Sequence, residues 1–195
     1  EIEITRKKIE VPTVKHEMLE DGIGYIAITS FDEITPNQFD AALEDLQGQG
    51  LRGLILDLRD NLGGRVDAVE KIADALLPEG IITYTVDKNG EKITYTSDAE
   101  HALGLPLTVL VNENSASASE ILAGAIQDHG VGTLVGTRTY GKGLVQRTVP
   151  FQDDTALKVT MAKYYTPNGN YIHGVGIEPD IVIDLPAGVS YQSLV

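Results

Sequence analysis

Residues 107–126 read LTVLVNENSASASEILAGAI, which predicts a strand, a short loop and a helix in direct succession. The apolar run Leu107–Val111 is typical of a strand, and apolar residues from Ile121 to Ile126 recur at helical spacing. The residues between them are small, and the helix is expected to begin at about Ser117. Backbone amides at a helix N-terminus point outward and favour negative charge, so this junction is a candidate site for chemistry.

The same alternation of strand and helix extends to both sides of this segment. Helical periodicity is present at 35–46, 66–76 and 117–129, and strand-like segments lie at 22–29, 53–58, 81–86, 92–96, 107–111, 131–136, 144–151, 156–164 and 181–183. A further edge strand is predicted at 2–9. Repeated strand–helix–strand units imply right-handed crossovers and a mixed, largely parallel sheet. The sequence therefore predicts one α/β domain.

Composition limits the class of protein. A chain of 195 residues can bury a substantial core, and 42% apolar with 23% charged residues is typical of a globular domain. No apolar run approaches ~20 residues, so no membrane-spanning helix is predicted. The net charge of −14 argues against a nucleic-acid-binding surface and is attributed mainly to solubility. Without cysteine, thiol catalysis and disulfides are excluded, and neither a metal site nor a cofactor is expected.

Ser117 is the candidate nucleophile. A serine hydroxyl attacks a carbonyl only when a base takes its proton and hydrogen-bond donors stabilise the oxyanion. The amide of Ala118 is one candidate donor. Gly63 and Gly64 follow the strand at 53–58, and glycine there allows the backbone to approach a substrate closely.

A structural interpretation of Ser117 competes with the catalytic one. Ser117 and Glu120 have the spacing of a capping box, which stabilises a helix start and performs no chemistry. Ser115 and Ser119 are also available as nucleophiles from composition alone. The local sequence does not decide among these alternatives.

Lys142 is the candidate base, because none of the four histidines lies in a recognisable Ser–His arrangement. Gly141 and Gly143 flank this lysine and leave room for a backbone or a substrate beside it. On an extended segment Gln146 falls on the same face as Lys142 and can orient its amine. The alternative is a basic residue at an ordinary turn. A phosphate-binding loop is excluded, since the spacing that it requires is missing.

Two acidic residues have less specific interpretations. Asp57 lies inside the apolar segment 53–58 and needs a partner, for which Arg59 is the candidate in a structural pair. Asp128 and His129 end the helix that begins at Ser117; a solvated helix end is the structural interpretation of both, and it is favoured for His129.

Five segments, taken in order, resemble the carboxyl-terminal processing (tail-specific) proteases of serine peptidase family S41. The resemblance extends from about Gly22 to Ile183. Its segments are 57–64 (DLRDNLGG), 114–121 (NSASASEI), 140–146 (YGKGLVQ), 164–169 (YYTPNG) and 174–180 (GVGIEPD). One departure is Leu62, where many members have proline, and this change is expected to be tolerated.

The resemblance implies a role for each candidate residue. Ser117 would be the nucleophile, Lys142 the general base and Gln146 the residue that holds the lysine. Gly63 and Ala118 would form the oxyanion hole. Asp128 and Gly64 would support the site.

The resemblance also implies a fold, a substrate and partners. The fold would be the crotonase-like (ClpP/crotonase) ββα core, and the substrates proteins with apolar, unstructured C-termini, cut outside the cytoplasm in the periplasm or cell envelope. Members usually carry a PDZ domain before this core. Residues 1–20 are therefore expected to be the connector that follows a missing PDZ domain, and residues 21–195 the protease core. Whether the chain forms a homo-oligomer is left open.

Two further functions are compatible with a crotonase-like scaffold. The first is a noncatalytic binding module, which is favoured when the serine or the lysine is lost, whereas here both remain. The second is an acyl-CoA enzyme, which would need a carboxylate acid/base and a CoA pocket, and the sequence shows no signal for either.

Overall fold

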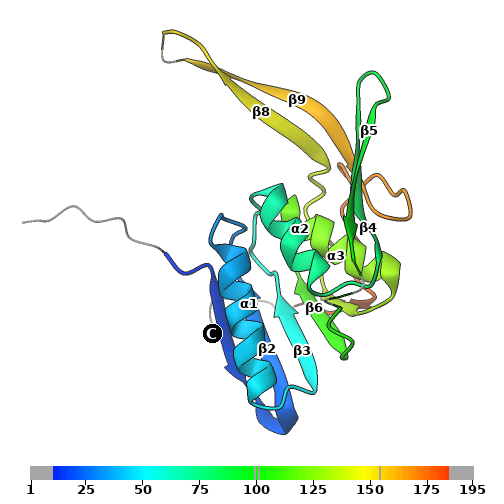
Figure 1. Cartoon of the computed structure of the whole chain (residues 1–195). Helices are drawn as coiled ribbons and strands as arrows, with labels where there is room; N and C mark the ends of the chain where they lie inside the picture. Colours follow the sequence, from blue (N-terminus) through cyan, green and yellow to red (C-terminus); the bar gives the residue numbers. More distant parts are fainter. Residues whose placement is uncertain (1–10, 99, 101, 154, 185–195) are drawn as a thin grey trace, which may run out of the picture.

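The computed structural model describes residues 11–98, 100, 102–153 and 155–184. Its main layer is a six-stranded sheet in the order β1-β2-β3-β6-β7-β10 (Figure 1). The strands are β1 Val14–Met18, β2 Ile23–Ile28, β3 Gly53–Asp57, β6 Leu107–Val111, β7 Thr133–Gly136 and β10 Ile181–Val182. Only β1 is antiparallel to its neighbour, so the prediction of a mixed, largely parallel sheet is confirmed.

Three helices pack together beside this sheet. They are α1 Thr35–Gly48, α2 Val66–Asp74 and α3 Ala118–His129, and a short 3-10 turn spans Glu20–Gly22. α1 contacts β1 and β2, whereas α2 and α3 contact each other and β4. The central strand β3 is mostly buried, as expected for a strand covered on both faces. No helix among the described residues is both long and apolar enough to cross a membrane.

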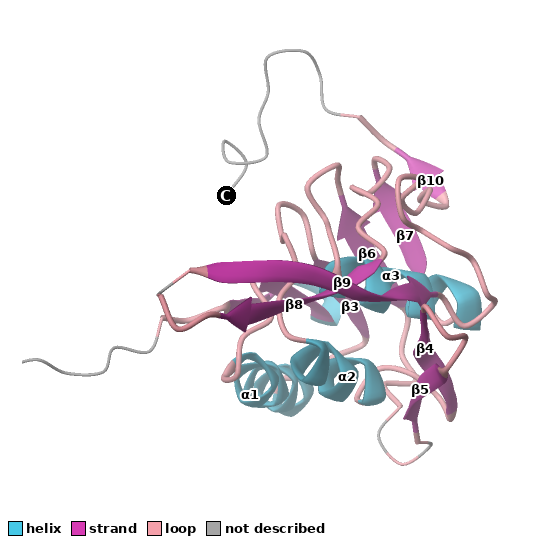
Figure 2. Cartoon of the chain, turned by 90° about the horizontal axis from the view of Figure 1, so that it is seen from above, coloured by secondary structure: helices cyan, strands magenta, loops and turns pink. Residues whose placement is uncertain are grey.

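A second, four-stranded sheet has the order β5-β4-β9-β8 and is antiparallel throughout. Its strands are β4 Gly80–Asp87, β5 Lys92–Ser97, β8 Leu144–Pro150 and β9 Ala156–Tyr165. The hairpin of β8 and β9 extends well beyond the helices, as Figures 1 and 2 show from two directions. We call this hairpin, residues 144–165, the arm.

The structure adds two features to the prediction from sequence. β1 at Val14–Met18 pairs with β2, whereas the edge strand predicted at 2–9 lies outside the described residues. The strands at 144–150 and 156–165 form a sheet with β4 and β5 instead of extending the parallel sheet. A hairpin pairs locally with itself, so it can leave the parallel sheet without a crossover helix.

The expected pairing of Asp57 with Arg59 is confirmed. Nε of Arg59 donates to Oδ1 of Asp57 at 2.9 Å, and the hydroxyl of Tyr25 on β2 donates to Oδ2 at 2.7 Å. Burial and this hydrogen bond to a carboxylate raise the pKa of Tyr25 to about 12. These contacts satisfy a buried carboxylate at the end of β3, directly before the glycine loop.

Candidate active site

Ser117 occupies a strained backbone position at the start of α3. Its φ of 58° and ψ of −112° lie outside the regions that residues with a side chain normally adopt. Such strain persists only where the surrounding structure enforces it, and it is concentrated at functional sites.

The two neighbouring serines are structural. Ser115 and Ser119 are 0% exposed, and their hydroxyls donate at 2.8 Å to the carbonyl oxygens of Leu58 and Asn61. Both therefore fasten the turn before α3 to the loop that follows β3. Ser117 is only partly buried, so it is the serine of the three that a substrate can reach.

Gly63 lies directly against this turn. A Cβ atom at Gly63 would lie 2.6 Å from the Ala116 carbonyl oxygen, 2.8 Å from Cβ of Ser117 and 2.9 Å from the Ala118 nitrogen. Its φ of 98° also requires glycine. The missing side chain thus leaves open the space in front of the Ala118 amide, which as a first-turn amide has no acceptor within the helix.

Asn61 fixes the glycine loop from inside the protein. Its Nδ2 donates to the Ile28 carbonyl at 2.8 Å, while its Oδ1 accepts the Gly63 amide at 2.8 Å. Asn61 is 0% exposed, and its own carbonyl accepts the Ala116 amide at 3.0 Å. To donate to an oxyanion, the Gly63 amide would therefore have to break its hydrogen bond to Oδ1 of Asn61 and form one to the substrate oxygen.

Gly64, in the same loop, packs closely against the backbone of Phe31. A Cβ atom there would lie 2.2 Å from the carbonyl oxygen of Phe31, which accepts the Arg65 amide at 2.7 Å. Because Gly64 has no side chain, the segment after β2 and the segment after β3 can run side by side below the site.

The carboxylate of Glu120 joins the serine turn to the lysine loop. Oε2 accepts the backbone amides of both Ser117, at 2.9 Å, and Lys142, at 2.7 Å. Oε1 accepts the Gly141 amide at 2.7 Å and the Thr139 hydroxyl at 2.6 Å. Because one oxygen accepts both amides, the backbone nitrogens of Ser117 and Lys142 are at most about 6 Å apart.

Glu120 was seen from the sequence only as one half of a capping box. The Ser117 amide does donate to it in that manner, so the capping interpretation is correct in part. The remaining three hydrogen bonds come from the loop 19 to 22 residues further on. The sequence signal that could have pointed to them is the carboxylate at the start of a mostly apolar helix; in the structure Glu120 is 0% exposed.

The glycines around Lys142 accommodate another part of the chain. A Cβ atom at Gly141 would lie 2.8 Å from the Gly176 nitrogen, and one at Gly143 would lie 2.8 Å from the His173 nitrogen. The Gly174 amide also donates to the Gly141 carbonyl at 2.9 Å. The loop 172–176 thus supports the lysine loop from behind, and Lys142 itself remains partly buried.

The hydrogen bonds of Gln146 and Asp128 in this structure are to residues other than Ser117 and Lys142. Gln146 is exposed on β8, with Nε2 3.5 Å from the Thr160 hydroxyl, and its contact with Lys142 stays a prediction. Asp128 is about 16 Å along α3 from Ser117, given the helical rise per residue. Its Oδ2 accepts the Asn168 amide at 2.8 Å, so any support that it gives to the site passes through the loop at 166–170.

The described site can be compared with known proteins. The model of peptidase family S41 matches residues 22–183. The chain belongs to peptidase family S41. The carboxyl-terminal-processing protease of Synechocystis sp. is 43% identical over 95% of this chain, and a probable CtpA-like serine protease of Staphylococcus aureus is 39% identical over 100% of it. The resemblance inferred from the five segments is thus confirmed.

A solved structure shows the same fold. The photosystem II D1 C-terminal processing protease superposes with a TM-score of 0.81 at 34% identity, over 92% of this chain and 50% of that one. The chain spans less than half the length of the curated relatives, 44% of the Synechocystis protein and 39% of the Staphylococcus aureus protein. This S41 chain therefore corresponds to one part of those longer proteases.

Replacing Gly63 with alanine in the S41 chain is expected to lower peptide cleavage by about 100-fold. The new methyl group would press on Ser117 and cover the Ala118 amide, so the turn before α3 would be displaced. Gly48→Ala is the matched control, because a Cβ atom there would have no atom within 4 Å other than those of its chain neighbours and the backbone of its own helix. The measurement is kcat/KM on one peptide, with unfolding curves recorded beside it. Equal rates for the two variants would contradict a role of Gly63 in the site.

Proposed function

We propose that this chain is the catalytic core of a serine endopeptidase in which Ser117 is the nucleophile and Lys142 the general base. The observation that carries the proposal is the bridge made by Glu120, whose Oε2 binds the backbone amides of both residues. Two residues 25 positions apart are thereby brought to one place, on two loops that are each fixed by buried hydrogen bonds. Such fixed placement is what an activated nucleophile requires.

The proposed reaction follows the chemistry of acyl transfer. The neutral amine of Lys142 takes the hydroxyl proton while Oγ of Ser117 attacks the carbonyl carbon of the scissile peptide bond. The resulting oxyanion accepts hydrogen bonds from the amides of Ala118 and Gly63. When the tetrahedral intermediate collapses, the lysine returns the proton to the leaving amine. A water molecule, deprotonated by the same lysine, then hydrolyses the acyl-enzyme and restores Ser117.

Further parts of the proposal rest on kinship with the carboxyl-terminal processing proteases. Substrates would be proteins with apolar, unstructured C-termini, cleaved near that end, with Gln146 turning toward Lys142 when a substrate is bound. The scaffold would be the crotonase-like ββα core. A PDZ domain upstream of it would deliver the substrate tail, in the periplasm or cell envelope. The proposal leaves open whether the assembled protein is a homo-oligomer.

A fluorophosphonate probe tests the proposed nucleophile directly, because it reacts covalently with activated serines. We expect one adduct per chain, located by mass spectrometry on the peptide that contains Ser117. Heat-unfolded protein is the control and should remain unlabelled, since activation depends on the fold. Absence of labelling and of peptide cleavage, even when the chain is joined to a PDZ domain from a relative, would favour the noncatalytic binding module.

A further inference from the structure

The outer edge of β8 is an unpaired sheet edge that begins beside the candidate base. β8 is the last strand in the order β5-β4-β9-β8, and within the described part of the chain no strand pairs with its other side. Leu144, its first residue, is two positions after Lys142. We call the main-chain N–H and C=O groups of Leu144–Pro150 that face away from β9 the β8 edge.

Among the residues that the structure describes, nothing gives this edge the protection that exposed edges normally have. Natural proteins blunt an edge strand by shortening it, by placing charges or proline along it, or by covering it. β8 is seven residues long, carries one charge at Arg147 and has proline only at its last position. Almost all of its contacts with other elements are with β9, and Figure 1 shows the arm standing clear of α1 and α2.

One face of the arm is largely apolar and carries a single charged side chain, that of Arg147. Opposed residues in antiparallel strands share a face, and the pairs are Val145 with Ala162, Arg147 with Val159 and Val149 with Leu157. Val149 is 39% exposed and Leu157 52% exposed. A chain added to the β8 edge could place every second side chain beside this stripe.

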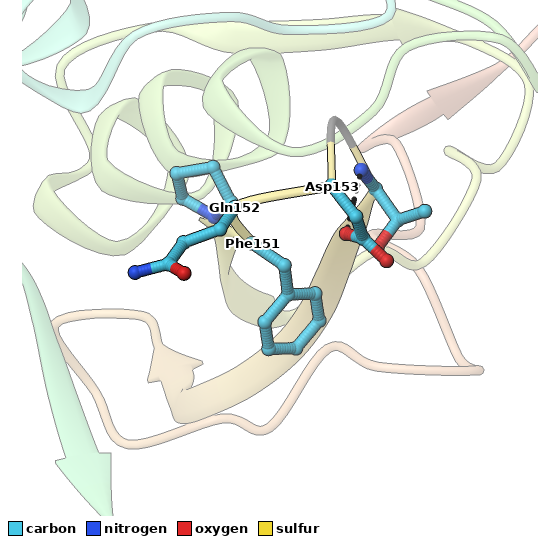
Figure 3. A pocket seen from close by; sticks show the side chains of 5 residues that line it. Phe151, Gln152 and Asp153 are labelled. Atoms are coloured by element: carbon cyan, nitrogen blue, oxygen red, sulfur yellow. Dashed lines mark hydrogen bonds between the residues drawn. The ribbon is translucent and has the colours of Figure 1, made fainter.

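The stripe continues to the tip of the arm. A hollow there is lined by Pro150, Phe151, Gln152, Asp153 and Thr155. Figure 3 shows the ring of Phe151 and the side chain of Gln152 extending from the tip in different directions, and Phe151 is 53% exposed. The β8 edge therefore leads from the lysine loop to an exposed aromatic side chain, over about 23 Å for seven strand residues.

We propose that the β8 edge binds the substrate polypeptide as an added strand, on one side of the scissile bond. This inference rests on the proposed function and names its substrate more closely: an extended segment of about seven residues with apolar side chains at alternate positions. Main-chain hydrogen bonds supply affinity in such strand addition, and the alternate side chains supply selectivity. A substrate that is helical or folded in this segment cannot bind.

The first test modifies the substrate alone. A ten-residue apolar peptide that the parent chain cleaves is N-methylated at one position at a time. We expect kcat/KM to fall about 10-fold or more at every second position along one side of the cleavage point, because only alternate amides face the strand. Losses confined to the two residues next to the cleaved bond, or losses without alternation, would overturn the proposal.

The second test modifies the edge. Thr148→Pro and Val149→Pro each remove one amide donor, and because adjacent amides point in opposite directions, one of the two faces the β8 edge. The matched controls are Ile93→Pro and Thr94→Pro on β5, the opposite edge of the same sheet. At least one β8 variant should cleave long peptides about 10-fold more slowly, whereas the β5 variants should resemble the parent.

Fluorophosphonate labelling separates the two proposals. If the parent neither labels nor cleaves, the proposed function fails. If the parent labels and cleaves, but both β8 variants cleave long peptides at the parent rate, only the strand-addition proposal fails. Support requires slower cleavage of long peptides by a β8 variant that still reacts with the probe at the parent rate.

Discussion

Replacing Ser117 with alanine is expected to reduce peptide cleavage by about 10⁴-fold or more, and replacing Lys142 with alanine should have nearly the same effect. When residues act as one unit in acyl transfer, the effects of their substitutions on the rate are not additive. The double variant should therefore be no slower than either single variant. The measurement is kcat on one peptide under saturating conditions. Stability should change little, because Ser117 and Lys142 are only partly buried and neither side chain belongs to the hydrophobic core.

Lys142→Arg is the sharpest control for the base. Arginine keeps the positive charge and much of the length of lysine, but its guanidinium stays protonated and cannot take the serine proton. We expect this variant to be as slow as Lys142→Ala and to label slowly with the fluorophosphonate probe. A Lys142→Arg variant with near-parental kcat would show that the lysine contributes only charge, and the assignment as base would be wrong.

Replacing Glu120 with glutamine is expected to lower both activity and stability. The side-chain amide keeps one oxygen, so its NH2 group must face two donors, whichever way it is turned. Either the amides of Ser117 and Lys142 or the donors of Gly141 and Thr139 then lose their acceptor. Leaving two donors unpaired in a fully buried position should cost about 3 kcal/mol of unfolding free energy. For a chain of this size, that corresponds to a fall in Tm of roughly 6–12 °C.

The effect on activity distinguishes positioning from general stability. At 10 °C, where the Glu120→Gln variant should remain folded, kcat should still be about 100-fold lower while KM changes little. The reason is that the proposed nucleophile Ser117 and base Lys142 are displaced, whereas the surface that binds the peptide is intact. Glu44→Gln on the exposed face of α1 serves as the matched control and should have the kcat and the stability of the parent. A Glu120→Gln variant that loses stability but keeps its kcat would mean that Glu120 only supports the fold.

Local sequence was sufficient for most of the elements. The three helices and the strands from β2 to β9 lie close to their predicted positions, since apolar periodicity and glycine or proline boundaries depend on neighbouring residues. The pairing of Asp57 with Arg59 was also predictable, because the partners are two residues apart. β1 was missed, since Val14–Met18 is mostly exposed and its sequence lacks a run of alternating apolar residues.

By itself, the sequence determined the α/β class, the S41 kinship and the candidate pair of Ser117 and Lys142, because these depend on residue types in a fixed order. Only the tertiary structure decided which of the three serines is accessible and what Glu120 holds. The contacts of Ser115, Ser119 and Glu120 reach residues 19 to 58 positions away. It also decided that β8 is the last strand of its sheet in the described part of the chain. Spacing along a chain does not specify such partners, because they are set by the packing of one loop against another.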